Sequence, residues 1–295
     1  MDPHLLRTFV TVARLGSFSA AAAELRYTQA AVSQQIAALE GDLKVTLLNR
    51  RPVTPTEPGV RLLEHAEPIL LRIEAARADL TRMTQSPAST LVIGATPLAA
   101  ATAEGGGLAA ALGTLRQRMP RLDVTVRVAS RSSVTIGVAR GELDVGLIDG
   151  LAASGDSLPP LASAPLSAVG VAESAVGVVF PLDHPLASRA SLRLADLLDA
   201  RWIDAPEAAP PLSDIRRVAR TDGFRPALTY EGTDTLTLIA LAAAGHGLTL
   251  LPTGLAALGE CAAVRVGEPR IVHRVELIHG TLREGSPAAE LASLL

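Results

Sequence analysis

The chain has 295 residues, enough for one small domain and one or two medium domains with separate cores. Its net charge of −3 provides no overall basic field for nucleic acid, and its single cysteine, Cys261, excludes an internal disulfide. Lys44 is the only lysine, which excludes a phosphate-loop or Schiff-base lysine elsewhere. The N-terminus lacks the pattern of a signal peptide and no apolar run could span a bilayer, so we expect a cytoplasmic protein without membrane contact.

Residues 17–43 predict two helices joined by a short polar turn. Ser17 or Ser19 is suited to cap the first helix, and Thr28 to cap the second, which we expect to end at Gly41. A third helix, over residues 4–15, precedes this pair. Two helices separated in this way have the geometry that places a helix in a DNA groove.

The second helix of the pair has one apolar and one polar face. The apolar stripe consists of Val32, Ile36, Leu39 and Leu43. The polar face carries Gln29, Ala30, Ser33 and Gln34 near the helix N-terminus. Glutamine can bind adenine through its amide, serine can bind a phosphate or a base edge, and alanine can contact a thymine methyl. The alternative is an ordinary solvated face.

A short β-wing is predicted after this helix, with the adjacent arginines Arg50 and Arg51 and with Thr54. Arginines at a wing tip are well placed to bind phosphates or to enter a narrow minor groove. Thr56 is suited to cap the helix that follows. Residues 1–61 hold seven Lys or Arg against five Asp or Glu, so DNA affinity should depend on pairing two copies rather than on bulk charge.

This region closely resembles the LysR-type transcriptional regulators. The matching residues are Phe9, Val12, Gly16-Ser17-Phe18, Ala21-Ala22, Leu25, Thr28-Gln29, Val32-Ser33, Gln35-Ile36, Leu39-Glu40, Leu43, Leu47, Arg50, Thr56 and Gly59. The DNA-binding residues expected from chemistry and resemblance are Ser17, Thr28, Gln29, Ala30, Ser33, Gln34, Arg50, Arg51 and Thr54. The chain departs from the family pattern at Lys44, usually glycine, at Leu48, usually aromatic, and at Ala30, often proline.

A long helix is predicted from Glu57 to about Met83, with an apolar heptad seam and a charged opposite face. The seam positions expected to mediate dimerisation include Leu62, Ile69, Ile73 and Leu80. The alternative is a helix that packs on its own domain. Pro68 predicts a kink or a break, and the stretch from Thr84 to Ser89 predicts a hinge.

From Leu91 onward, strands alternate with helices, which predicts an α/β domain with mostly parallel sheets. The expected strands are Leu91–Gly94, Val124–Val128, Asp144–Ile148, Val176–Phe180, Trp202–Ile203, Leu228–Glu231, Leu248–Leu251 and Val275–Ile278. This part is similar to the LysR effector domain, which resembles type 2 periplasmic binding proteins, with two α/β lobes linked by two crossing strands. The predicted fold is therefore an α+β two-part protein, an N-terminal winged helix-turn-helix with a long linker helix followed by a two-lobe α/β effector domain.

The predicted boundaries follow from these patterns. We expect a DNA-binding domain at 1–58, a linker helix and hinge at 59–88 and an effector domain at 89–295. Within the last, lobe I would comprise about 91–165 and 267–295, and lobe II about 166–266.

Ligands of open α/β sheets lie beyond the carboxyl ends of the strands, and helix N-termini there attract anions. The candidate effector-binding residues are Thr96, Pro97, Arg131, Ser132, Asp204 and Thr233. Together they suggest a polar cleft for a small organic anion or zwitterion, although a capping threonine or serine is more often structural. Three successive glycines, Gly105–Gly107, predict a broken helix or a mobile loop near this cleft.

The chain lacks a G-x-S-x-G nucleophile elbow, a phosphate loop, HExxH and CxxC, and its six histidines have no metal-binding spacing. We therefore expect no enzyme, no metal and no cofactor. The alternative of a solute-binding protein would leave the N-terminal 85 residues without a role. The resemblance implies a bacterial DNA-binding regulator that is switched by a small-molecule effector. Its expected partners are double-stranded operator DNA and further copies of itself, as a dimer or tetramer, and RNA polymerase is a candidate.

Overall fold

The computed structural model describes residues 1–84, 90–102, 107–159, 166–256 and 260–295. The chain forms two compact units, one of residues 1–80 and one that holds the described residues from 81 onward. None of the helices in the described part of the chain is both long and apolar enough to cross a membrane.

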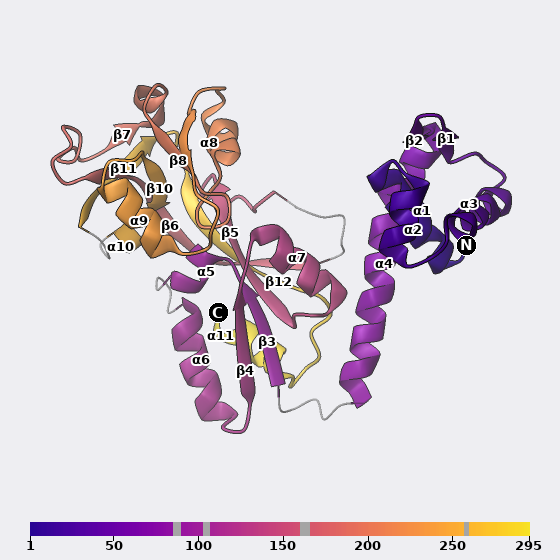
Figure 1. The fold of residues 1–295 in the computed structure, drawn as a ribbon. Coiled ribbons are helices and arrows are strands. Elements are labelled where there is room, and N and C mark those ends of the chain that lie inside the picture. Colours follow the sequence, from indigo (N-terminus) through magenta and orange to yellow (C-terminus); the bar gives the residue numbers. More distant parts are fainter. Residues whose placement is uncertain (85–89, 103–106, 160–165, 257–259) are drawn as a thin grey trace. The chain divides into compact units, whose positions relative to one another are not determined.

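The N-terminal unit is a winged helix-turn-helix followed by a long helix (Figure 1). Its elements are α1 (Pro3–Leu15), α2 (Phe18–Leu25), α3 (Gln29–Leu43), β1 (Leu48–Arg50), β2 (Val53–Pro55) and α4 (Glu57–Thr84). Ser17 caps α2, since its hydroxyl accepts the Ala20 N–H at 3.2 Å. Thr28 caps α3 in the same way, accepting the Ala31 N–H at 3.1 Å. Both helix starts confirm the capping predictions.

The apolar stripe of α3 lies in the core of this unit. Val32, Ile36 and Leu39 have no exposed surface and pack in one cluster with Phe9 and Val12 of α1. Burial of this stripe fixes the rotation of α3, so its polar face is directed away from the core. The predicted assignment of the two faces is therefore confirmed.

The end of α3 differs from the prediction. The helix continues through Gly41 to Leu43, and Lys44 takes the left-handed conformation with φ 55° while its N–H donates to the Glu40 carbonyl. Leu43 packs partly buried against the core cluster, so the extra residues cover apolar surface that a helix ending at Gly41 would leave exposed. The position that ends α3 is the one at which the resembled family usually has glycine.

Replacing Lys44 with glycine is expected to stabilise the N-terminal unit by about 1 kcal/mol, because glycine adopts positive φ without the steric cost of a Cβ. Hydrogen exchange of the α3 amides would measure the change. Lys44→Ala removes the same side chain but keeps the Cβ, so this control should show no gain. An equal gain in both variants would contradict the backbone explanation and point to the lysine charge.

Helix α4 is one continuous helix of 28 residues with Pro68 inside it. Of the kink or break predicted at Pro68, the break is therefore wrong within the described backbone, and the kink stays a prediction. Proline removes one helical hydrogen bond, to the carbonyl of Glu64, and the turns on either side remain intact. Of the predicted hinge, Thr84 still belongs to α4, and residues 85–89 lie outside the described residues.

Several residues of α4 are held by contacts inside their own unit. Ala66 is buried, Leu62 packs partly buried against the core cluster, and Arg7 of α1 forms an ion pair with Glu74, with Nη2 and Oε1 2.6 Å apart. Other residues of the predicted seam are not covered in this way: Ile69 is 36% exposed and Leu80 is 64% exposed. Some residues of the seam thus pack inside the unit, whereas others form an apolar surface that is exposed in the single chain.

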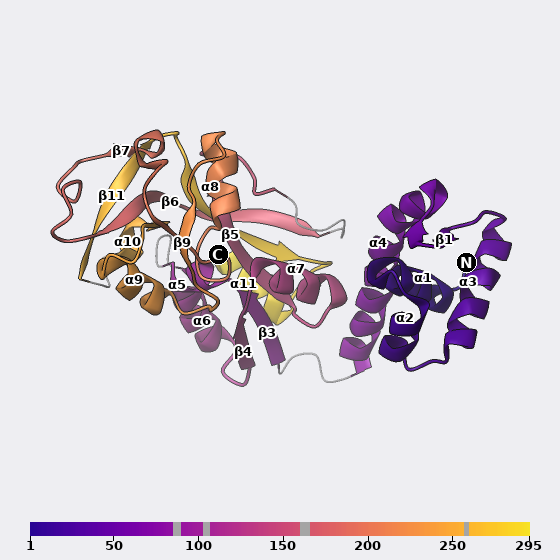
Figure 2. The same cartoon turned by 45° about the horizontal axis from the view of Figure 1, so that its top comes forward.

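The C-terminal unit combines a central sheet with helices on both faces (Figures 1 and 2). Its strands are β3 (Thr90–Ala95), β4 (Asp123–Val128), β5 (Val145–Ala152), β6 (Ser167–Pro181), β7 (Leu192–Arg193), β8 (Trp202–Asp204), β9 (Pro226–Thr229), β10 (Thr249–Pro252), β11 (Cys261–Glu268) and β12 (Val272–His279). Its helices are α5 (Pro97–Ala101), α6 (Gly107–Arg118), α7 (Arg131–Arg140), η2 (Leu194–Leu197), α8 (Leu212–Ala219), α9 (Thr235–Ala243), α10 (Thr253–Ala256) and α11 (Pro287–Leu294).

The central sheet is mixed, not mostly parallel as predicted. Its order is β4-β3-β5-β12-β6-β11-β7, with β10 also paired to β6. Strands β4, β3 and β5 are parallel, but β12 is antiparallel to both β5 and β6, and β10 and β11 are antiparallel to β6. β8 and β9 form a separate parallel pair. Strand direction depends on how distant segments pair, which alternation along the sequence does not encode.

Strand β6 joins the two parts of this unit. Its residues 167–175 pair with β12, and its residues 176–181 pair with β10 and β11. In the part of the sheet that contains β3, β5 and β12, helices α6 and α11 pack on one face and α7 packs on the other (Figure 1). The strands β7 and β11 were not predicted from the sequence, and β6 extends well beyond its predicted range of Val176–Phe180.

The glycine-rich stretch separates two helices, as predicted. α5 ends at Ala101 and α6 begins at Gly107, whereas residues 103–106 lie outside the described residues. Gly107 has φ +55°, and a Cβ there would lie 2.1 Å from the carbonyl oxygen of Thr102. This position therefore requires glycine, for backbone conformation and for space.

Candidate DNA interface and effector site

The polar face of α3 offers a row of short or amide side chains. Gln29, Ala30 and Gln34 are exposed and Ser33 is partly exposed. Oε1 of the Gln29 side-chain amide accepts a hydrogen bond from the Ser19 hydroxyl at 3.2 Å, which links α3 to α2. The structure thus brings together the four residues expected to contact bases, on a helix whose opposite face is locked in the core.

Ser17 and Thr28 have structural roles that can be seen directly. Each hydroxyl accepts a backbone N–H as a helix cap, so the sequence prediction of a capping role is met while the DNA contact stays a prediction. Thr54 lies on β2 and accepts a hydrogen bond from the Asn49 side-chain amide at 3.1 Å, across the two strands of the wing. Arg51 is exposed in the turn between these strands.

Arg50 is held in place by two neighbours. Its Nη2 lies 3.3 Å from Oε2 of Glu40, and its guanidinium carbon lies 5.0 Å from the centre of the Phe18 ring. Glu40 is part of the family pattern in the sequence, but its contact with Arg50 was not predicted. The arginine is prepositioned at the wing instead of moving freely in solvent.

Thr96 is buried at the start of α5, between β3 and the helix. Threonine is a common capping residue, but the Thr96 side chain makes no cap hydrogen bond. Instead the hydroxyl donates a short hydrogen bond to Oδ1 of Asp149, and its N–H donates to the Leu147 carbonyl at 2.9 Å. Pro97 follows as the first residue of the helix and is buried.

Asp149 is the centre of a buried polar group that was not predicted from the sequence. His273 is fully buried on β12, and its Nε2 lies 2.9 Å from Oδ2 of Asp149. Burial raises the pKa of Asp149 most strongly, but the hydrogen bond and charge of His273, the bond from Thr96 and the charge of Arg131 together lower the pKa below its ordinary value. An ionised carboxylate only accepts, so His273 and Thr96 both donate to it.

Arg131 lies at the first residue of α7, where Ser130 caps the helix. Its Nη2 donates to the Pro159 carbonyl at 2.6 Å, while its buried Nε has no hydrogen-bond partner among the described residues. Burial lowers the pKa of Arg131, and the charges of Asp214 and Asp149 oppose that shift. A buried guanidinium N–H without an acceptor is a strong donor available to an anion.

The start of α5 lies where the two parts of this unit meet, and Arg131 at the start of α7 is close enough to Asp214 of α8 for their charges to interact. Leu98 of α5 packs in a buried cluster with Ile203 and Ala205, which flank the predicted effector residue Asp204. Arg217 of α8 donates to the Leu151 carbonyl of β5 at 3.4 Å. The junction therefore gathers candidate residues from both sides.

The remaining candidates are placed less specifically. Oδ1 of Asp204 accepts the Leu212 N–H at 3.1 Å, which anchors the start of α8. Ser132 is exposed and shares a hydrogen bond with Ser130, with the two hydroxyl oxygens 3.1 Å apart. Thr233 is exposed just before α9, whose capping residue is Asp234. These contacts are of the kind that local structure requires.

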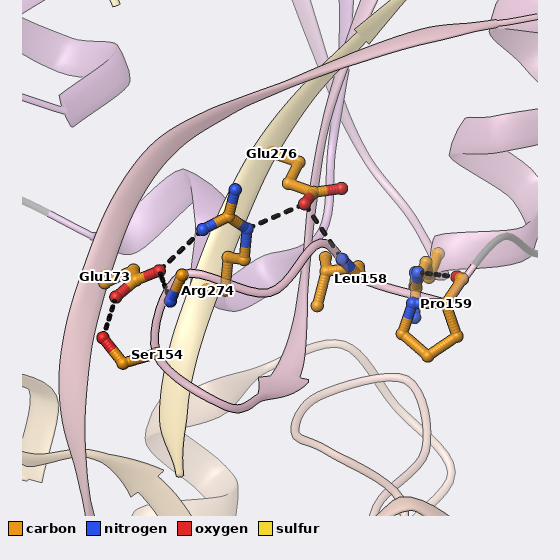
Figure 3. A network of polar contacts seen from close by, with 8 residues as sticks. Ser154, Leu158, Pro159, Glu173, Arg274 and Glu276 are labelled. Atoms are coloured by element: carbon orange, nitrogen blue, oxygen red, sulfur yellow. Dashed lines mark hydrogen bonds and ion pairs between the residues drawn. The ribbon is translucent and has the colours of Figure 1, made fainter.

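A second polar network holds the segment that follows β5 (Figure 3). Arg274 of β12 donates to Glu173 of β6 at 2.6 Å and to the buried Glu276 at 2.8 Å. Glu276 also accepts the Leu158 N–H at 2.9 Å, and Glu173 accepts the Ser154 hydroxyl at 2.9 Å. One arginine thus compensates two carboxylates, which in turn fix the backbone leaving β5.

No group of three or more His, Cys, Asp or Glu side chains is arranged to hold a metal ion in the described ranges of the chain. The polar groups described above pair with one another, with helix ends or with backbone. The Nε of Arg131, unpartnered among the described residues, also offers a donor for an anion.

Comparisons with known proteins agree with this architecture. Residues 3–60 match the family model described as bacterial regulatory helix-turn-helix protein, lysR family, and residues 84–292 match the LysR substrate binding domain. The HTH-type transcriptional regulator AlsR of Bacillus subtilis is 32% identical over 257 residues, covering 86% of this chain and 81% of that protein. An uncharacterized HTH-type transcriptional regulator of Escherichia coli, YnfL, is 31% identical, covering 96% of this chain and 94% of that protein.

Solved structures show the same fold. Full-length BenM has a TM-score of 0.56 at 22% identity, covering 100% of this chain and 95% of that chain. CbnR in complex with its target DNA has a TM-score of 0.52 at 21% identity, covering 100% of this chain and 98% of that chain. Similar proteins are named as transcriptional regulators, not as enzymes. The two family matches together span almost the whole chain, and this protein belongs to the LysR family of transcriptional regulators, with a DNA-binding helix-turn-helix and an effector-binding domain.

Proposed function

We propose that two copies of the chain bind an interrupted, two-part operator, each inserting α3 into a major groove. The observation that carries this proposal is the exposed face of α3, with Gln29, Ala30, Ser33 and Gln34 opposite a fully buried stripe. Arg50, Arg51 and Thr54 of the wing, with Ser17 and Thr28 at the helix starts, would contact the backbone. The family match supports DNA as the ligand of this face.

The proposed pairing uses the part of α4 that its own unit leaves uncovered. Ile69 and Leu80 are exposed apolar residues on one helix, and Ile73 between them is partly exposed. Leu62, the fourth predicted dimerisation residue, is partly used inside the unit, so we assign it a smaller share of the interface. A coiled-coil seam of this kind would bury these side chains in a dimer, and a tetramer would pair two such dimers.

The proposed effector is a small organic anion or zwitterion, bound where α5 and α7 begin. Thr96, Pro97, Arg131 and Ser132 approach this junction from one side and Asp204 and Thr233 would approach from the other. The unpaired buried Nε of Arg131 supports a negatively charged group there. To regulate, the effector must bind one arrangement of the lobes better than the other, since equal binding shifts nothing.

The same proposal includes the predicted boundaries at residues 58 and 88, with the lobes divided at about 165 and 267. It places the protein in a bacterial cytoplasm and makes RNA polymerase a candidate partner. These points rest on the sequence pattern and the family.

Footprinting of the full-length protein on the DNA upstream of its own gene would test the proposal. We expect a protected site of two parts, spaced by whole helical turns and resistant to competitor DNA at two salt concentrations. Repeating the footprint with small carboxylates and amino acids should reveal a compound that changes the protected spacing. Protection without sequence preference, or none from a folded dimer, would contradict the proposed DNA site.

Replacing Ser33 or Gln34 with alanine should abolish the preference for the operator over a mutated operator. Each lost base contact should reduce the difference in binding free energy between the two DNAs by about 1–3 kcal/mol. Competition binding would measure the specificity ratio, and sedimentation would show unchanged oligomers. Gln117→Ala, an exposed glutamine on α6 of the other unit, is the matched control and should change neither quantity. Loss of dimers in the α3 variants would show that this face is an interface between copies.

A further inference from the structure

Glu40 lies near the end of α3 and connects that helix to the wing. Its Oε1 accepts the N–H groups of Leu47 and Leu48, at 2.8 and 3.2 Å, and its Oε2 lies 3.3 Å from Nη2 of Arg50. Its side chain is 15% exposed. One carboxylate therefore fixes both the backbone that enters β1 and the side chain at the end of that strand.

Arg50 receives a second restraint from α2. Its guanidinium lies over the ring of Phe18, the first residue of α2, with 5.0 Å between the guanidinium carbon and the ring centroid. The Arg50 side chain nevertheless remains 51% exposed. Because an arginine has five N–H donors and Glu40 engages Nη2 alone, most of the group stays available to a phosphate.

We propose that Glu40 is a positioning residue for DNA binding, which holds the Arg50 guanidinium in the place where it meets a backbone phosphate. The inference rests on the proposed function, in which Arg50 contacts DNA. A long side chain that is ordered before binding loses less conformational freedom on binding. Glu40 would act through Arg50 and would not touch DNA itself.

The isosteric variant Glu40→Gln separates this role from a structural one. Its amide oxygen still accepts the Leu47 and Leu48 N–H groups, but the charged contact with Arg50 is lost. We expect operator affinity to fall about two- to tenfold, the cost of ordering one long side chain. The salt dependence of binding should remain that of the wild type, since Arg50 still reaches its phosphate.

Glu24→Gln is the matched control, because Glu24 forms an exposed ion pair with Arg14 in the same unit. It removes the same charge, and this should leave operator affinity unchanged or slightly higher. The probe is a DNA duplex selected by the full-length protein from a random-sequence pool. Binding by Glu40→Gln that equals or exceeds binding by Glu24→Gln would overturn the inference.

The variant Arg50→Ala separates the proposed phosphate contact of Arg50 from the proposed positioning role of Glu40. We expect it to weaken binding and reduce the salt slope by about one, and Glu40→Gln added to it should cause no further loss. If Arg50→Ala binds as wild type, the proposed phosphate contact and the inference both fail. If Arg50→Ala weakens binding but the Glu40→Gln effect is additive to it, the contact stands and the positioning role fails.

Discussion

Replacing Arg274 with alanine is expected to destabilise the C-terminal unit by about 3–5 kcal/mol. Arg274 donates to the carboxylates of Glu173 and Glu276, at 2.6 and 2.8 Å, and Glu276 is only 2% exposed (Figure 3). Without the guanidinium, Glu276 would keep the Leu158 N–H as a donor but would lose its hydrogen-bonded counterion, leaving a buried charge with only the electrostatic influence of Arg131. Leaving one partner of a buried ion pair uncompensated is among the costliest single changes.

Urea unfolding followed by tryptophan fluorescence would measure this loss. Trp202 is the only tryptophan of the chain, and it is fully buried in the C-terminal unit, so its signal reports that unit alone. Arg118→Ala is the control, since Arg118 pairs with Glu290 at 3.1 Å while 52% exposed. Surface pairs contribute about 0–1 kcal/mol, so a loss of that size in Arg274→Ala would refute the role of the network.

Replacing Asp149 with alanine should lower the free energy of unfolding of the same unit by about 2–5 kcal/mol. The change removes the acceptor of both His273, which is fully buried, and Thr96, which is 4% exposed. Each buried donor left without a partner costs about 1–3 kcal/mol, and the vacated volume adds to the cost. Asp196→Ala, which removes an exposed carboxylate paired with Arg193, is the control and should cost less than about 1 kcal/mol.

The Asp149 effect should depend on pH in a defined direction. The pKa of Asp149 is lowered in the folded protein, so its charged form stabilises the fold at all pH values above the unfolded pKa of about 3.9. That contribution is lost as the pH falls through the lower folded value. The difference between wild type and Asp149→Ala should therefore be constant near neutrality and shrink below about pH 4. A difference that grows in acid would contradict the assigned direction.

The sequence was sufficient wherever a local pattern carries the structure. Helix starts at Ser17 and Thr28 follow from capping chemistry, and the buried stripe of α3 follows from its spacing. The parallel strands β3, β4 and β5 follow from short apolar runs alternating with helices. These features depend on residues only a few positions apart, so they can be read along the chain.

The polar contacts of the candidate sites depend on residues far apart in the sequence. Asp149 meets His273 because β12 pairs antiparallel with β5, a strand direction that the predicted, mostly parallel sheet did not include. Thr96 is suited to cap α5, yet its hydroxyl is used by Asp149 because the neighbouring strand presents a charged acceptor there.

The difference between what the sequence predicts and what only the tertiary structure shows therefore has a physical reason. The sequence by itself determined the two-part architecture, the recognition helix and the family pattern, because hydrophobic periodicity and capping are local properties. Only the tertiary structure decided where α3 ends, which strands join the lobes, and that Glu40 and Arg274 each hold more than one partner. Those outcomes depend on burial and strand pairing between segments distant in the chain, whose energies no short stretch of sequence contains.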